Sequence, residues 1–343
     1  MEDPPSPGPL LELGTAYWTS KAFLTACNLG LFSLIEGGND TVERLAGALS
    51  LPLRGTRYLL EGMTALGLLE KTGEQYRTTP LASAHLVDGK PEYMGDLFVT
   101  LDRHFFAPFQ DLETAMRRDG PVWPVDSLGR RVPLTPEQSE LFTRGMHGLT
   151  GATGAAFGRE WASGLSCRRH LLDIGGGSGA MSIGAAGQAP GLRATVLDRP
   201  VPCAVAREYI AAAGLSDRVD TLESDIFEDP FPDGPDAHLY SNVLQNYGED
   251  RCRGLLQKSF GALPPGGGVV IAELVLDDER TGPPFPVAFN FLALVVTERG
   301  GTRTYDEYRS WLEEAGFVGI ELQHLFGPTS LVFGTKPEAG PAA

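Results

Sequence analysis

The stretch HLLDIGGGSG, residues 170–179, decides the fold, because an apolar run leads directly into four glycines within five positions. The apolar run predicts a β-strand, and the glycines predict a tight turn into a helix. Glycines at alternate positions remove the Cβ atoms at the turn, so a bulky cofactor can lie against bare backbone at the helix N-terminus. The motif therefore predicts a nucleotide-type cofactor site that uses Asp173, Gly175 and Gly177.

Four further apolar runs follow this strand, separated by helical stretches of a dozen or more residues. The five predicted strands are HLLDIG (170–175), RATVLD (193–198), VDTLESD (219–225), AHLYSNV (237–243) and GGVVIAEL (267–274). Strands that alternate with helices indicate an α/β fold with a parallel, Rossmann-like sheet. Two last apolar runs flank Gly327-Pro328 and predict an antiparallel hairpin that closes the sheet edge.

Two cofactors fit the glycine motif. Gly175, Gly177 and Ala180 also satisfy the dinucleotide pattern G-x-G-x-x-A, so the loop alone leaves NAD open. Asp198 ends the second predicted strand, 19 residues after Gly179, where a carboxylate can accept both hydroxyls of a ribose. This spacing strengthens the nucleotide assignment without choosing between the two cofactors.

A further acid favours S-adenosylmethionine. Asp225 ends the third predicted strand, where it can hydrogen-bond an adenine edge while Ile226 or Phe227 covers the adenine face. The acids Asp173, Asp198 and Asp225 thus follow three successive strands. Together with the terminal hairpin, this series fits S-adenosylmethionine better than a dinucleotide.

The first third of the chain is predicted to be mainly helical. Apolar residues between 10 and 35, Leu13 and Tyr17 among them, recur at three and four positions and predict a buried helix face that is interrupted near Gly30.

A compact unit of two helices and a hairpin is predicted next. Asp40 with Glu43 marks a helix start, 58–69 predicts a second helix, and 71–79 predicts a small hairpin, which together give the winged-helix order. Residues 40–80 hold five basic and five acidic side chains, so this unit is expected to serve packing or dimerisation rather than DNA binding.

Composition narrows the class of protein. The chain has 343 residues, which suffices for about two domains, and its net charge of −16 disfavours a nucleic-acid partner. It contains no apolar run of roughly 18 residues that could span a membrane, and its first residues lack the basic region of a secretory signal. The four cysteines lie far apart without a CxxC pair, which indicates neither a metal site nor a disulfide framework. These are Cys27, Cys167, Cys203 and Cys252. A cytoplasmic protein without a metal is expected.

Four segments are predicted along the chain. They are a helical dimerisation and winged-helix-like domain (1–110), a helical linker that lines the substrate pocket (111–167), a cofactor-binding catalytic domain (168–337) and a tail (338–343). An aromatic cluster near the first boundary contains His104, a candidate hydrogen-bonding residue for a substrate.

These motifs together carry a family resemblance. The relevant stretches are LLDIGGGSG, VLDRP, SDIF, SNVLQNYGED, LPPGGGVVIAE and TRTYDEYRSWLEEAGF. The chain resembles, over about residues 10–335, the S-adenosylmethionine-dependent O-methyltransferases of the caffeate and acetylserotonin type, close to the bacterial branch that tailors aromatic polyketides. The resemblance implies that Asp198 binds ribose, that Asp225 and Ile226 bind adenine, that Gly175 and Gly177 flank the cofactor, and that Ser241 stands near it.

The chain departs from that family at the catalytic positions. Most relatives have a histidine that deprotonates the acceptor, and Gln245 stands there instead. An amide is not a base, so a contribution of typically ~10²–10⁴-fold is missing. Of the two acids that flank the histidine in the family, Glu273 is retained, whereas the second position is Thr302.

Three explanations stay open. The acceptor is acidic enough that alignment suffices, which can itself supply ~7–11 kcal/mol, as the resemblance to the anthracycline-tailoring branch implies. Alternatively His147, where relatives line the substrate pocket, replaces the base. Finally, the chain has left methyl transfer for a non-methylating reaction such as hydroxylation or cyclisation.

The favoured interpretation is a homodimeric enzyme that methylates a hydroxyl of an aromatic or polycyclic small molecule in secondary metabolism. The candidate catalytic residues are Gln245, Glu273 and His147. The candidate substrate contacts are Met146, His104, Asn246 and Asn290. A winged-helix regulator that senses a small ligand is the alternative from another class, and a salt-dependent DNA-binding assay distinguishes it.

Overall fold

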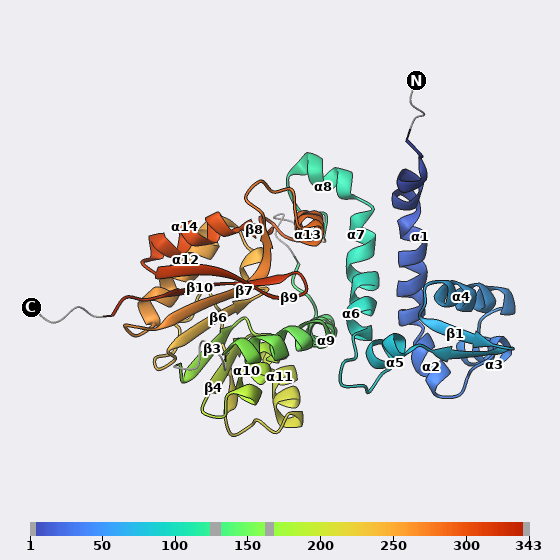
Figure 1. The fold of residues 1–343 in the computed structure, drawn as a ribbon, viewed down its shortest axis with the longest axis horizontal. Coiled ribbons are helices and arrows are strands. Elements are labelled where there is room, and N and C mark those ends of the chain that lie inside the picture. Colours follow the sequence, from blue (N-terminus) through green and yellow to red (C-terminus); the bar gives the residue numbers. More distant parts are fainter. Residues whose placement is uncertain (1–4, 124–131, 162–167, 339–343) are drawn as a thin grey trace, which may run out of the picture. The chain divides into compact units, whose positions relative to one another are not determined.

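The computed structural model describes residues 5–123, 132–161 and 168–338. The chain forms two compact units, Met1–Phe106 and Ala107–Ala343 (Figure 1). Each unit has its own hydrophobic core, and each is described here by itself. The four-segment division predicted from the sequence, including a separate linker, stays a prediction.

The first unit is helical and carries one small hairpin. Its elements are α1 (Gly8–Asn28), α2 (Leu31–Glu36), α3 (Val42–Leu49), α4 (Leu53–Ala65), β1 (Leu69–Thr72), β2 (Gln75–Thr78), α5 (Pro80–Leu86), α6 (Gly95–Thr100) and a π-helical turn, η1 (Leu101–Phe106). The predicted interruption between the first two helices is confirmed, because Gly30 adopts φ 63° between α1 and α2. The predicted order of two helices and a hairpin is also confirmed.

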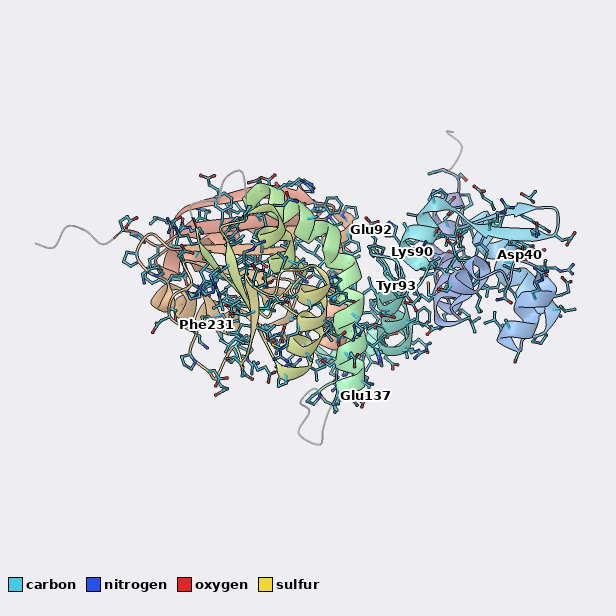
Figure 2. All side chains as sticks on the ribbon, turned by 90° about the horizontal axis from the view of Figure 1, so that it is seen from below. Asp40, Lys90, Glu92, Tyr93, Glu137 and Phe231 are labelled. Atoms are coloured by element: carbon cyan, nitrogen blue, oxygen red, sulfur yellow. The ribbon has the colours of Figure 1, made fainter. Side chains whose placement is uncertain are left out.

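Two predicted helix boundaries in this unit are wrong. Helix α3 is capped by Thr41, whose hydroxyl accepts the Arg44 amide, while Asp40 forms an ion pair with Arg44 and accepts a hydrogen bond from Gln75. Asp and Thr are both good caps, so the sequence pattern alone cannot separate neighbouring positions. The second helix ends at Ala65, and Leu69 already begins β1. Asp40 therefore belongs to a surface network near the hairpin (Figure 2).

The N-terminal half of α1 exposes its large apolar side chains. Leu13 and Tyr17, which the periodicity placed on a buried face, are 77% and 59% exposed in the single chain, and Trp18 is 62% exposed. The second half of α1 is buried, since Ala26 and Cys27 belong to the core of this unit. Periodicity identified an apolar helix correctly, but it cannot tell a core from a surface that a partner covers.

The second unit is built on an eight-stranded sheet. Its strands are β3 (His170–Ile174), β4 (Arg193–Asp198), β5 (Val219–Glu223), β6 (Ala237–Ser241), β7 (Gly268–Leu276), β8 (Arg303–Thr304), β9 (Val318–Phe326) and β10 (Thr329–Thr335). The order is β5-β4-β3-β6-β7-β10-β9, with β8 paired to β7. Strands β3 to β7 are parallel, and the β9–β10 hairpin joins β7 antiparallel, as the sequence predicted.

Helices cover both faces of this sheet (Figure 1). The helices of this unit are α7 (Ala107–Phe109), α8 (Leu112–Arg118), α9 (Pro136–Glu160), α10 (Ala180–Gln188), α11 (Pro200–Ala212), α12 (Glu249–Ala262), α13 (Pro284–Val296) and α14 (Tyr305–Ala315), and η3 (Leu244–Asn246) is a 3-10 turn. One core cluster joins the sheet to α12 and α14, and another joins it to α9, α10 and α11. The doubly covered sheet places the carboxyl ends of β3, β4 and β6 at one edge, where parallel sheets bind ligands.

Helix α9 docks onto α10 through glycines. A Cβ at Gly154 would overlap the carbonyl of Ala180, and a Cβ at Gly184 would overlap the carbonyl of Gly154. The two helix backbones are therefore in direct contact beside the first turn of α10. Thr135 and Gln138 begin α9 with a reciprocal capping box, and Glu137 lies in its first turn (Figure 2).

Three further expectations concern membrane spans, the cysteines and the tail. Within the described residues no helix is long and apolar enough to cross a membrane. Cys27, Cys203 and Cys252 are buried free thiols, whereas Cys167 lies outside the described residues. The predicted tail also lies outside them, except for Glu338.

Candidate active site

The loop between β3 and α10 has the backbone that its glycines predicted. Gly175, Gly177 and Gly179 adopt φ of 68°, 57° and 75°, a region that L side chains rarely occupy. A Cβ at Gly175 would come within 2.9 Å of Val243 Cγ2, so this loop packs directly against the segment that follows β6. A Cβ at Gly177 would meet nothing within 4 Å. The loop thus offers an open backbone face at Gly177.

Two of the predicted acids lie at this loop. Asp198, at the end of β4, accepts hydrogen bonds from the Gly177 amide at 2.9 Å and the Arg199 amide at 2.7 Å. Burial raises the pKa of the Asp198 carboxyl, and those amide hydrogen bonds oppose the shift. Asp173 is fully buried, and its Oδ2 accepts the Ser182 hydroxyl at 2.8 Å. Burial raises the pKa of Asp173 to about 6.

The strand before the third acid, Asp225, ends two residues earlier than predicted. Strand β5 ends at Glu223, so Asp225 follows the strand rather than ending it. The exposed carboxylate of Asp225 accepts the amides of Phe227 and Glu228, which orders the turn that presents Ile226. The sequence does not mark the strand end, because Glu223, Ser224 and Asp225 are all polar. The adenine contacts assigned to Asp225 and Ile226 stay predictions.

These residues fit a nucleoside cofactor. Among the described residues, the buried Oδ1 of Asp173 has no hydrogen-bond partner, which leaves an acceptor unused directly under the glycine loop. Asp198 has acceptor capacity left after its two amide bonds, because a carboxylate offers about four acceptor positions. The open face at Gly177 adds the space. Together they supply the acceptors and the bare backbone that the nucleotide-type prediction requires.

The carboxylate of Glu273 holds the turn after β6 through hydrogen bonds from the backbone amides of the turn. This residue of β7 is fully buried, and its carboxylate accepts the amides of Val243, Leu244 and Gln245 at 2.8, 2.6 and 3.1 Å. Tyr308 of α14 donates a fourth hydrogen bond at 2.5 Å. Burial raises the pKa of Glu273 to about 7, against the effect of these four donors. The carboxylate is fully used inside the protein and fixes the shape of the turn.

Gln245 lies on this turn and is 5% exposed. Its Nε2 donates to Asn242 Oδ1 at 3.2 Å, and its Oε1 has no partner among the described residues. Asn242 adopts φ 56°, a conformation that asparagine tolerates better than most residues. Asn246 is exposed, and its Nδ2 donates to the carbonyls of Asn242 and Val243. The turn, residues 242–246, therefore carries three amide side chains and no base.

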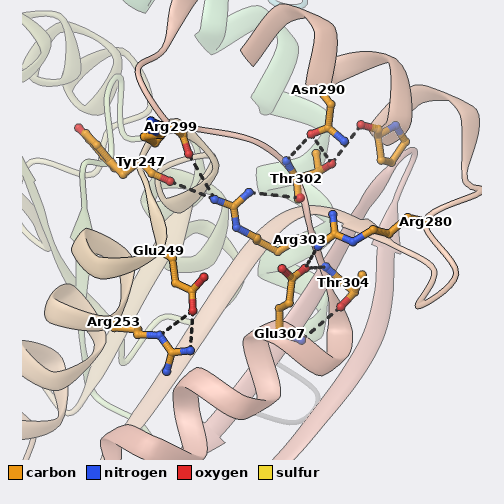
Figure 3. A network of polar contacts seen from close by, with 11 residues as sticks. Tyr247, Glu249, Arg253, Arg280, Asn290, Arg299, Thr302, Arg303, Thr304 and Glu307 are labelled. Carbon is orange, nitrogen blue, oxygen red and sulfur yellow. Dashed lines mark hydrogen bonds and ion pairs between the residues drawn. The ribbon is translucent and has the colours of Figure 1, made fainter. Parts of the chain in front are cut away.

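The loop 299–303 donates hydrogen bonds to backbone carbonyls in and directly after this turn (Figure 3). Arg303 donates to the carbonyls of Tyr247, Arg299 and Thr302, and the Gly301 amide donates to the carbonyl of Gln245 at 2.8 Å. These carbonyls and the ring of Trp311, 5.7 Å away, contact the guanidinium. The turn is thus fixed through its amides by Glu273 and through its carbonyls by this loop.

Thr302 stands where the resembled family has its second acid, and a threonine hydroxyl cannot serve as a carboxylate. It is 1% exposed, and its Oγ1 donates to Asn290 Oδ1 at 2.9 Å or to the Pro286 carbonyl at 3.2 Å, two acceptors for one proton. Its backbone amide also donates to Asn290 Oδ1, at 2.8 Å. The amide oxygen of Asn290 is therefore committed to this loop, and its candidate contact with a substrate stays a prediction.

His147 lies against the glycine loop. Its Nδ1 is 2.9 Å from Ser178 Oγ, and its ring stacks on Tyr209 of α11 with centroids 3.5 Å apart and an interplanar angle of 8°. Burial lowers the pKa of His147 to about 4. The imidazole is neutral at pH 7, but with this pKa it is a weak proton acceptor.

The remaining candidates are dispersed. Met146 is half-buried beside His147 on α9, and Ser241 is half-buried at the end of β6, as predicted. His104 lies on η1 in the first unit, where burial lowers its pKa. Its role as a substrate contact, like that of Met146, stays a prediction.

Some functional side chains act through other residues and could not be found from the sequence motifs. Tyr308 holds Glu273 and Asn242 holds Gln245, and neither stands in a motif that names such a role. Ser178 was quoted within the glycine motif but was given no function. The serine inside an otherwise glycine-only turn, with its polar side chain, was the one signal that could have found it.

The fold and the site define a class before any comparison is made. The features that define an S-adenosylmethionine-dependent methyltransferase are a sheet of order β5-β4-β3-β6-β7-β10-β9, a glycine loop after β3 and a carboxylate, Asp198, at the end of β4.

Comparisons with known proteins agree with this class. A family model described as an O-methyltransferase domain matches residues 114–318, and one described as an O-methyltransferase dimerisation domain matches residues 11–88. The chain belongs to the O-methyltransferase family. The predicted family and the choice of S-adenosylmethionine over NAD are therefore confirmed.

Individual relatives span nearly the whole chain. The chain is 36% identical to the 3-hydroxy-5-methyl-1-naphthoate 3-O-methyltransferase of Streptomyces sahachiroi, over 95% of this chain and 94% of that one. It is 29% identical to the tetracenomycin polyketide synthesis 8-O-methyl transferase of Streptomyces glaucescens, over 96% and 97%. The crystal structure of human N-acetylserotonin methyltransferase in complex with S-adenosylmethionine superposes with a TM-score of 0.88 at 25% identity, over 98% and 99%.

Proposed function

We propose that this enzyme transfers a methyl group to an acidic aromatic hydroxyl, of the hydroxynaphthoate or phenolic polyketide class, by alignment and without a protein base. The observation that carries the proposal is the turn at Gln245, whose three consecutive amides are held by Glu273 and which contains no base. The names of the Streptomyces relatives supply the class of acceptor.

The cofactor would be held by the glycine loop and the acids around it. Asp198 would accept the ribose hydroxyls, Asp225 and Ile226 would contact the adenine, and Gly175, Gly177 and Ser241 would border the rest. Asp173, with its unpaired Oδ1, would accept a hydrogen bond from the amino-acid part of the cofactor or from an intervening water. When bound, S-adenosylmethionine supplies an electrophilic methyl group on a positively charged sulfur.

The turn residues would orient the acceptor. Gln245 has an unpaired Oε1 and can offer a hydrogen bond of either polarity, and Asn246 stands exposed next to it. Glu273 is a positioning residue in this proposal, since all of its hydrogen bonds go to the turn and to Tyr308. Gln245 and Asn246 would therefore fix the acceptor, and Glu273 would fix Gln245.

An acceptor that is already ionised explains the missing base. A phenol conjugated to a quinone carbonyl is more acidic than a simple phenol, whose pKa is about 10. Part of it is then already ionised near neutral pH, so the protein needs only to align it with the methyl group. The low pKa of His147, about 4, supports this explanation over a replacement base on α9. Met146 and Asn290 would then contribute to the shape of the pocket.

The loss of both catalytic partners also favours a second candidate function. With Gln245 and Thr302 in place of a base and an acid, the bound cofactor could serve a non-methylating reaction such as hydroxylation or cyclisation. The two candidates differ in one product, since only methyl transfer yields S-adenosylhomocysteine together with a methylated acceptor.

We also propose a cytoplasmic homodimer. Leu13, Tyr17 and Trp18 form an exposed apolar surface on α1, and the match to a dimerisation domain covers this helix. The winged-helix-like unit, with equal numbers of basic and acidic residues between 40 and 80, would serve this association. The buried free thiols Cys27, Cys203 and Cys252 fit a reducing compartment.

The experiment is an incubation with methyl-labelled S-adenosylmethionine and a panel of hydroxynaphthoates and phenols. Transfer of the label to a hydroxynaphthoate, absent with Gly177→Val, supports the proposal. Binding of the cofactor without transfer of label to any acceptor would favour the non-methylating function, and label on nitrogen or carbon would contradict the hydroxyl assignment.

A further inference from the structure

Helix α9 holds the cofactor loop through one side chain. His147 reaches Ser178, the one residue with a side chain beyond Cβ between Gly175 and Gly179, with 2.9 Å between Nδ1 and Oγ. Ser178 is 4% exposed, so this hydrogen bond is shielded from water. The backbone amides of the loop make further hydrogen bonds: those of Gly175 and Gly176 donate to the Leu197 carbonyl, and that of Gly177 donates to the Asp198 carboxylate.

His147 is itself fixed on its other side. Its ring stacks on Tyr209 at 3.5 Å between centroids, and Arg144, one turn earlier on α9, forms ion pairs with Glu208 of α11 and Glu140. The imidazole is therefore confined between α11 and the loop. A side chain restrained in this way loses little further entropy when it holds Ser178.

The backbone of α9 approaches the same place. The glycine contact between Gly154 and Ala180 sets α9 against the first residue of α10, directly after the loop. His147 lies two helical turns before Gly154 on α9, so the helix contacts the loop and the helix that follows it at two separate points. Movement of α9 is thus coupled to the glycine loop.

We propose that His147 is a positioning residue for the cofactor loop: it holds Ser178 and thereby raises the affinity for S-adenosylmethionine and its demethylated product. The inference deepens the proposed function, on whose cofactor site it rests, and replaces a proton-transfer role for His147 with a binding role. Three glycines with positive φ make the loop intrinsically adaptable, so an external restraint lowers the cost of ordering it.

Calorimetric binding of S-adenosylhomocysteine to the full chain tests the inference. We expect His147→Ala to weaken binding about tenfold and His147→Asn to restore it to within about threefold, because the Asn amide can reach Ser178 as either donor or acceptor. Ser178→Ala should weaken binding like His147→Ala, and the double variant should be no worse than either single one. His324→Ala, at an exposed histidine of β9, is the matched control.

Hydrogen exchange of the cofactor-free protein gives a second readout. The amides of residues 175–179 should exchange faster in His147→Ala than in the wild type and in His147→Asn. A purely structural role would lower the melting temperature while leaving the S-adenosylhomocysteine dissociation constant within twofold, and that result overturns the inference. An equal loss in the Ala and Asn variants overturns it as well, whereas a wild type that does not bind the ligand would overturn the cofactor site and the inference together.

Discussion

Replacement of Gln245 by alanine separates alignment from base catalysis. In the structure this side chain makes one hydrogen bond, from Nε2 to Asn242, and leaves Oε1 unpaired. Its removal therefore deletes at most one bond to the acceptor and one to Asn242, each worth about 1 kcal/mol. At about 1.4 kcal/mol per factor of ten, we expect Gln245→Ala to lower kcat/KM about tenfold, far less than the ~10²–10⁴-fold typical of a lost base.

The assay is label transfer to one hydroxynaphthoate between pH 6 and 9, with the wild type, Gln245→Ala and the exposed Gln323→Ala as a control. The rate of the chemical step should rise with the ionisation of the acceptor, and its midpoint should move when an acceptor of different acidity is used. A loss above about 10³-fold at Gln245, or a midpoint that stays fixed for all acceptors, would refute alignment by an ionised acceptor. A comparable loss in His147→Ala with saturating cofactor would assign the base to His147.

Four further outcomes are expected. Gly177→Val should abolish S-adenosylhomocysteine binding with a small loss of stability, about 1–2 kcal/mol, because φ is 57° there and the new side chain fills the open face; calorimetry and thermal unfolding measure both. Glu273→Gln should lower the free energy of unfolding by about 3 kcal/mol in urea titrations, because it sets an amide group against buried donors, while Tyr308→Phe should cost only about 1 kcal/mol. Leu13→Glu with Trp18→Glu should yield monomers in sedimentation, whereas removal of 1–36 would also remove the core residues Leu31 and Phe32; a dimer that persists with both charges would contradict the interface. The pKa of His147 is lowered from 6.5 to about 4, so its neutral form stabilises the fold above pH 6.5, and this contribution is lost as the pH falls towards 4. The free energy of unfolding, measured by urea titration, should therefore drop between pH 7 and pH 5 by about 1–2 kcal/mol more in the wild type than in His147→Asn. Equal drops in the two proteins would refute the shift.

The parts of the fold that depend on local sequence could be predicted. The glycines of the motif predict a tight turn, and Gly175, Gly177 and Gly179 adopt positive φ there. The five apolar runs predict five strands, and each run overlaps one of the parallel strands β3 to β7. Boundaries were less certain where neighbouring residues serve equally well, as with Asp40 and the true cap Thr41. Asp225 was placed within a strand that ends at Glu223, because alternation alone does not show where pairing stops.

The site could be predicted only as far as motifs reach. Gln245 and Glu273 were found through the resemblance, but the bond from Tyr308 to Glu273 joins positions 35 residues apart and depends on how α14 packs on the sheet. His147 was assigned to a substrate pocket, whereas its observed partners, Ser178 and Tyr209, come from two other elements. Contacts of this kind arise from tertiary packing, which no single-sequence pattern encodes.

The framework around the Gln245 turn holds the backbone of the turn. Glu273, held by the Tyr308 hydroxyl, accepts the amides of the turn, while Arg303 donates to the Tyr247 carbonyl and the Gly301 amide donates to the Gln245 carbonyl. None of these bonds involves the side chain at position 245. Natural selection could therefore exchange the reactive group without dismantling its support, which makes the base the evolutionarily disposable part of this architecture. The same independence recommends Gln245→His as a starting point for engineering the enzyme towards less acidic acceptors.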